Sequence, residues 1–296
     1  MITDQDLPAL YRVANAASFR AQRTFLLLNR WTLSLLCLGA VLAILASLLE
    51  QAKSAASGMS AAIIVISAIL NSVANAINPE KVWYGSRAVA ESVKTLTWRY
   101  MAGAEPFPLI KPIREVEQEF AERLRKILEE RKQLAFAFAS NELASLHISD
   151  KMRHLRAESF EQRKAFYIKD RVLDQRTWYS KKAEENQKNS RMYFGLTVAS
   201  QILAALFAIF VAAHPDSKVN AASLFTTLAS AFIAWMQVRQ YSSLAQSYAV
   251  TAIELGLIYE EGKHLADDGE LAAFVADAEN AISREHTLWV ARRDRS

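Results

Sequence analysis

The stretch MSAAIIVISAILNSVANAINP (Met59–Pro79) contains no charged residue, yet it carries three asparagines. A helix of about 20 apolar residues crosses the ~30 Å hydrocarbon layer of a bilayer, so the run is long enough for a membrane span. Asn71, Asn75 and Asn78 lie four and three residues apart, which places them on one face of a helix. Carboxamides in contact with lipid are unfavourable, so the stretch predicts a membrane helix with one polar side.

Three further uncharged segments accompany this one, at residues 31–49, 192–213 and 219–238. A buried helix in a soluble core could explain one such run, but four runs in two close pairs favour a membrane. The composition agrees, because 52% hydrophobic residues with only 8 Gly and 6 Pro in 296 residues favour long helices. The sequence therefore predicts an all-α membrane protein with four transmembrane helices as two hairpins and long cytoplasmic amphipathic helices.

The distribution of lysine and arginine predicts the orientation. All but two of the 35 Lys and Arg residues lie outside the hairpin loops, which hold only Lys53 and Lys218. Positively charged segments stay in the cytoplasm, so we expect a multi-pass protein with cytoplasmic N- and C-termini and both hairpin tips outside. The same topology accounts for the net charge of +4, so nucleic acid is not an expected partner.

Two of the expected spans carry a polar stripe that could line a pore. Its candidate residues are Ser60, Ser67, Asn71, Asn75 and Asn78 on the second span, with Ser223, Thr226, Thr227 and Ser230 on the fourth. Three interpretations stay open: hydrogen bonds that hold helices together, a water-filled path, or, for the last two asparagines, contact with lipid headgroups. Four helices fill their own centre, so a pore would require a homo-oligomer.

The cytoplasmic part contains two amphipathic patterns. Proline marks a break at residues 104–112, and Ser149 or Asp150 is the expected N-cap of a later helix. From Arg114 to about Phe138, apolar residues recur at near-helical spacing and predict one buried stripe. That stripe consists of Val116, Phe120, Leu124, Ile127 and Leu134.

The second pattern leads into the third span and has one face rich in cations and aromatic rings. Its residues include Arg163, Tyr167, Arg171, Tyr179 and Lys182. Such a face is typical of solvated helices and of helix–helix contacts, but arginine and lysine beside aromatic rings also suit an anion or a nucleotide. The sequence leaves both interpretations open.

Three stretches resemble the SLATT family of bacterial two-span effector domains. They are WYGSRAVAESVKTLTWRYMAGAEPF (Trp83–Phe107), YIKDRVLDQRTWYSKKAEENQKNS (Tyr167–Ser190) and SREHTLWVARR (Ser283–Arg293). The resemblance implies two units in tandem, at 1–107 and 151–296, joined by a helical connector at 108–150. It further implies a membrane effector of prokaryotic antiviral defence that forms a pore or depolarises the inner membrane, in systems often encoded beside synthases of nucleotide second messengers.

The sequence shows no separate nucleotide-sensing domain, which departs from that picture. It also lacks the GxGxxG, GxxxxGK[ST], GxSxG and HExxH motifs, so we expect neither an enzyme nor a bound cofactor. The histidines are scattered without the spacing of metal ligands, so we expect no metal site. The alternative to a pore is a non-conducting sensor or scaffold whose cytoplasmic helices bind a partner.

Overall fold

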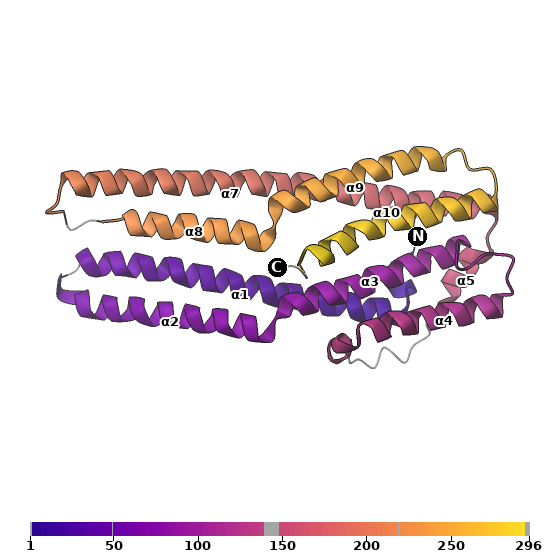
Figure 1. Cartoon of the computed structure of the whole chain (residues 1–296), viewed down its shortest axis with the longest axis horizontal. Helices are drawn as coiled ribbons and strands as arrows, with labels where there is room; N and C mark the ends of the chain where they lie inside the picture. The colour runs from indigo at the N-terminus through magenta and orange to yellow at the C-terminus, as the bar shows by residue number, and fades with distance from the viewer. Residues whose placement is uncertain (1, 49, 139–147, 218–219, 294–296) are drawn as a thin grey trace. The chain divides into compact units, whose positions relative to one another are not determined.

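The computed structural model describes residues 2–48, 50–138, 148–217 and 220–293, and these residues form helices and connections without a strand (Figure 1). The all-α prediction is confirmed for this part of the chain. The chain divides into two units. Unit 1 comprises Met1–Gln22, Glu80–Ala183 and Gln246–Ser296, and unit 2 comprises Arg23–Pro79 and Glu184–Ala245.

The two halves of the chain repeat one order of elements. A 40-residue helix, α1 (Ala9–Leu48) or α7 (Asp174–Ala213), comes first in each half. A return helix follows, α2 (Lys53–Ile77) or α8 (Ala222–Arg239), and then a further helix. This further helix is α3 (Pro79–Ala102) in the first half and α9 (Tyr241–Gly262) in the second.

A single left-handed residue separates the return helix from the next helix in both halves. Asn78 has φ 45° and Gln240 has φ 50°, a conformation that ends a helix. The backbone N–H of Asn78 donates to the carbonyl of Ala74 at 3.0 Å, and that of Gln240 donates to Met236 at 2.8 Å. The same device at equivalent places supports a duplicated unit.

The number of membrane spans differs from the prediction. Among the described residues, three helical ranges contain a stretch long and apolar enough to cross a membrane: Ala9–Leu48, Lys53–Ala102 and Phe160–Ala213. The expected fourth span at 219–238 fails this test, because α8 begins only at Ala222 and its 18 residues as a whole are not apolar enough. Its last turn also includes Arg239, which lowers its apolarity. Lys218 of the preceding loop lies outside the described residues.

Unit 1 has a continuous apolar core. The predicted stripe is confirmed on α4 (Ile113–Glu130), where Val116, Phe120 and Leu124 are buried. The helix ends earlier than predicted, and a 3₁₀ segment, Lys132–Phe138, follows it and buries Leu134.

The remaining helices of unit 1 are short or lie at the end of the chain. They are α5 (Asp150–Ala157), α6 (Phe160–Tyr167) and α10 (Asp268–Arg293). Ser149 caps α5 as expected, since its hydroxyl accepts the N–H of Met152 at 3.3 Å. A π-helical segment, Ile168–Leu173, joins α6 to α7, and such segments often occur where a helix places functional side chains.

Candidate functional site

Two serines of the polar stripe on α2 hold α2 against α1. The Ser60 hydroxyl donates to the backbone carbonyl of Gly39 at 2.9 Å, and the Ser67 hydroxyl donates to that of Thr32 at 3.0 Å. Both serines are buried. Gly39 permits the close approach, because a Cβ atom there would lie 2.9 Å from Cγ1 of Ile64. Ser60 and Ser67 of the stripe therefore belong to the contact between α1 and α2.

The three asparagines of the stripe lie at the surface of the chain. Asn71, Asn75 and Asn78 are all exposed, and Asn78 is the left-handed residue that ends α2. The side chains of Asn71 and Asn75 form no hydrogen bond with any described residue. Because Ile69 and Ile77 beside them are also exposed, this surface of α2 combines carboxamides with apolar side chains. The stripe thus divides into an inward pair of serines and an outward group of asparagines.

The second hairpin packs by different chemistry. Phe207 of α7 stacks on Phe225 of α8 with ring centroids 5.4 Å apart, and Tyr193 meets Phe232 at 6.1 Å. Aromatic rings thus lie between α7 and α8, whereas a glycine and two serines lie between α1 and α2.

The hydroxyl groups of α8 contribute no bond to α7 among the interactions described. Thr226 donates to the carbonyl of Ala222 and Thr227 to that of Ser223, each at 2.9 Å and within the same helix. Ser223, Thr226 and Ser230 are exposed, and Thr227 is half-buried. A hydroxyl satisfied by its own helix can face either lipid or water, so α8 gives no clear polar side.

In unit 1, an ion pair between Arg171 and Glu279 is fully buried. The guanidinium donates through Nε and Nη2 to the two carboxylate oxygens of Glu279, each bond being 2.7 Å long. The hydroxyl of Tyr167 donates to Oε1 at 3.0 Å, and that of Thr95 donates to Oε2 at 2.8 Å. Four donors therefore converge on one carboxylate, which compensates much of the cost of burying it.

The electrostatics of this network favour the charged form of Arg171. Burial disfavours the ionised guanidinium, but the Glu279 carboxylate outweighs this effect, and the pKa of Arg171 stays above its ordinary value. Burial, and then the same carboxylate, raise the pKa of Tyr167 well above its ordinary value, so this phenol remains a neutral donor.

These contacts correct the prediction of an open anion-binding face. Arg163, Tyr167, Arg171 and Tyr179 are buried, and Lys182 is half-buried with a contact of its own. Arg163 pairs with Asp268, as Arg171 does with Glu279. A free anion would have to displace one of these carboxylates, so the four buried residues form a helix–helix contact instead.

The sequence interpretation did not identify Glu279 and Asp268 as the partners of these arginines. A signal for Glu279 exists, since it lies on the apolar face of α10, four residues after Val275 and three before Ile282. An acid on such a face indicates a buried partner of opposite charge.

Family models match two consecutive parts of the chain. Residues 8–164 match "SMODS and SLOG-associating 2TM effector domain 3", and residues 167–289 match "SMODS and SLOG-associating 2TM effector domain 1". The chain belongs to the SLATT family. It carries two SLATT domains in tandem, as the resemblance predicted. No match was found among curated proteins or among solved structures.

The buried ion pair lies where the two SLATT domains meet. Tyr167, Arg171 and Glu279 belong to the second SLATT domain, and Thr95 belongs to the first. The pair of Arg163 with Asp268 likewise joins the first domain to the second. The expected connector at 108–150 falls inside the first family match. Unit 1 is thus built from both SLATT domains.

Proposed function

We propose that this SLATT protein is an effector of prokaryotic antiviral defence that assembles as a homo-oligomer and depolarises the inner membrane through a pore. The description of both domains as two-transmembrane effector domains supports the effector role. In this proposal α1 and α2 of the first SLATT domain form a membrane hairpin whose tip faces outward, and the termini are cytoplasmic. A nucleotide second messenger is the proposed trigger.

One observation carries the pore proposal: Asn71 and Asn75 are exposed on a helix that is otherwise suited to lipid. A carboxamide without a hydrogen-bond partner in hydrocarbon costs several kcal/mol. Polar side chains at membrane depth therefore face another protein surface or a water-filled cavity. In an oligomer, the α2 helices of several copies could surround a path lined by these asparagines.

The second candidate is a non-conducting sensor or scaffold. The bonds of Ser60 and Ser67 to α1 favour it, because they place part of the same stripe in helix packing. The asparagines would then form hydrogen bonds between copies without enclosing water.

Leakage of a trapped ion indicator from liposomes distinguishes the two candidates. The parent chain is compared with Asn71→Leu/Asn75→Leu and with Asn71→Ser/Asn75→Ser, which keeps polar groups at both positions. Each sample is sized in detergent first and tested with and without cyclic nucleotides. A path requires leakage from the parent and the serine variant, and none from an equally assembled leucine variant. Failure of the leucine variant to assemble, with a parent that never leaks, favours the scaffold.

A further inference from the structure

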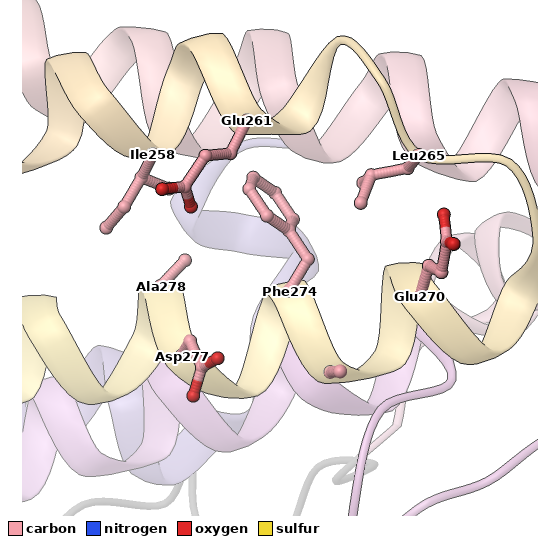
Figure 2. A pocket seen from close by; sticks show the side chains of 8 residues that line it. Ile258, Glu261, Leu265, Glu270, Phe274, Asp277 and Ala278 are labelled. Atoms are coloured by element: carbon pink, nitrogen blue, oxygen red, sulfur yellow. The ribbon is translucent and has the colours of Figure 1, made fainter.

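A pocket of about 280 Å³ opens between α9 and α10 in unit 1. Ile258, Leu265 and Phe274 contribute apolar side chains to its wall, with Ile258 on α9 and Phe274 on α10 both pointing into the space between the two helices (Figure 2). Two lining alanines, Ala273 and Ala278, leave room beside the ring. The volume suits one branched apolar side chain with its neighbours.

Three carboxylates lie around this apolar pocket. Glu261, Glu270 and Asp277 line it and are exposed (Figure 2). Glu270 accepts the backbone N–H of Ala266 at 2.7 Å, but none of the three forms an ion pair within the part of the chain that the structure describes. An apolar floor with three exposed carboxylates on its rim suits an apolar side chain flanked by cations.

The connection between α3 and α4 is complementary to this pocket, because it presents an apolar side chain beside two cations. The segment PLIKPIR (Pro108–Arg114) carries Ile110, whose side chain is 93% exposed, between two prolines. Lys111 and Arg114 beside it are also exposed. An isoleucine so completely in water is unfavourable in an isolated copy, and prolines limit how far the segment can move to hide it.

The buried side chain of Arg156 holds this segment in place. Its guanidinium donates to the carbonyl of Phe107 at 2.8 Å and to that of Pro108 at 3.0 Å. On the other side, the side chain of Leu109 packs against Gly103 so closely that a Cβ there would lie 2.7 Å from its Cγ. Ile110 is therefore presented by an ordered connection.

The segment and the pocket lie at the same end of unit 1. Arg156 of α5 binds the segment, and a few residues later Lys164 donates to the carbonyl of Leu265 at 2.7 Å beside the pocket. Copies that share one membrane orientation would present both surfaces at one level. Because the two surfaces differ, their contact is head-to-tail, which generates a closed ring or an open chain of copies.

We propose that the Pro108–Arg114 segment of one copy docks into the α9–α10 pocket of the next copy. Ile110 enters the apolar pocket against Phe274, and Lys111 and Arg114 approach Glu261 and Asp277. The contact deepens the proposed function, on which it rests, by naming the surface that joins copies of a pore. It is smaller than a standard interface of about 1,600 Å², so it depends on the high local concentration of copies held in one membrane.

Disulfide crosslinking in membranes tests the contact, because Cys37 is the chain's single cysteine and can be replaced by alanine. Ile110→Cys and Ala273→Cys are introduced together in that background and oxidised mildly. We expect a ladder of dimers, trimers and larger species. Each single variant should stay monomeric, and a mixture of the two should give dimers only. A dimer from Ile110→Cys alone, or no ladder from the double variant, overturns the docking.

A charge exchange provides a second test in the same crosslinking background. Lys111→Glu or Asp277→Lys alone should reduce the ladder roughly tenfold, and the two together should restore it. Lys126→Glu, an exposed charge on α4, is the matched control and should leave the ladder unchanged. Equal effects of all three single substitutions overturn the contact.

The crosslinks report assembly and do not require conduction, so the two proposals can fail separately. A specific ladder in a protein that never leaks would contradict the pore and leave the docking intact. Leakage from a parent chain whose cysteine variants give no ladder would contradict the docking and leave the pore intact.

Discussion

The two units satisfy their polar groups in different ways. Unit 1 buries an ion pair completely, with four donor contacts from Arg171, Tyr167 and Thr95 on the carboxylate of Glu279. Unit 2 uses serine hydroxyls on backbone carbonyls within its first hairpin and leaves Asn71 and Asn75 exposed. The buried carboxylate of Glu279 has its partners within a single copy, whereas the side chains of Asn71 and Asn75 have no described partner.

The largest expected effect comes from breaking the buried ion pair of unit 1. Glu279→Ala leaves the Arg171 charge buried without its partner, which typically costs 3–5 kcal/mol. We expect a large decrease in the midpoint of thermal unfolding of the full chain in detergent. Glu260→Ala is the matched control, because this carboxylate forms an exposed ion pair with Lys263 just after the end of α9.

A double variant shows whether the effect belongs to the charge. Arg171→Met/Glu279→Leu removes both charges and keeps apolar volume, so it should be less destabilised than Glu279→Ala alone. An unfolding midpoint of Glu279→Ala within error of the parent would contradict a buried, paired carboxylate in unit 1.

The intermediate effect concerns the close approach of α1 and α2 in unit 2. Gly39→Ala would place a Cβ 2.9 Å from Cγ1 of Ile64, so the side chain of Ile64 or the helix that carries it must shift. Gly58→Ala on α2 is the matched control, because a Cβ there meets no atom within 4 Å. Both changes gain the same helix propensity, so the difference between them isolates the clash. We expect Gly39→Ala to be less stable than Gly58→Ala by about 1–3 kcal/mol.

Unfolding of both glycine variants in the same detergent, followed by the loss of helical circular dichroism, gives this difference. Equal midpoints would mean that α1 and α2 are not held at the distance that the serine bonds of unit 2 indicate.

The sequence predicted what periodicity and capping encode. The spacing of Val116, Phe120 and Leu124 marked the buried face of α4, and Ser149 marked the start of α5. Hydropathy located three of the four expected spans. It overestimated the apolar length of the fourth, because the pattern of apolar residues does not show that α8 begins only at Ala222.

Partners distant in sequence could not be predicted in this way. Arg171 and Glu279 are 108 residues apart, and a helical pattern shows which residues share a face but not what packs onto that face. The cations from Arg163 to Lys182 therefore resembled a site for a free anion. The carboxylates that neutralise two of them, Asp268 and Glu279, come from α10. Likewise, one periodicity joined Ser60 and Ser67 to the asparagines, although only the serines contact α1.

The smallest expected effect compares hydroxyl groups of the two hairpins. Ser67→Ala removes a bond between helices and should destabilise the chain by about 0.6 kcal/mol, a typical value for such bonds in membrane proteins. Thr226→Ala removes only the bond from the Thr226 hydroxyl to the carbonyl of Ala222 within α8. This carbonyl still accepts its backbone hydrogen bond in the helix, so the substitution should have no measurable effect on stability. Unfolding by a denaturing detergent, measured for both variants beside the parent, checks the order. A loss from Thr226→Ala equal to that from Ser67→Ala would mean that α8 also uses its hydroxyls to hold a neighbour, and the contrast between the two hairpins would disappear.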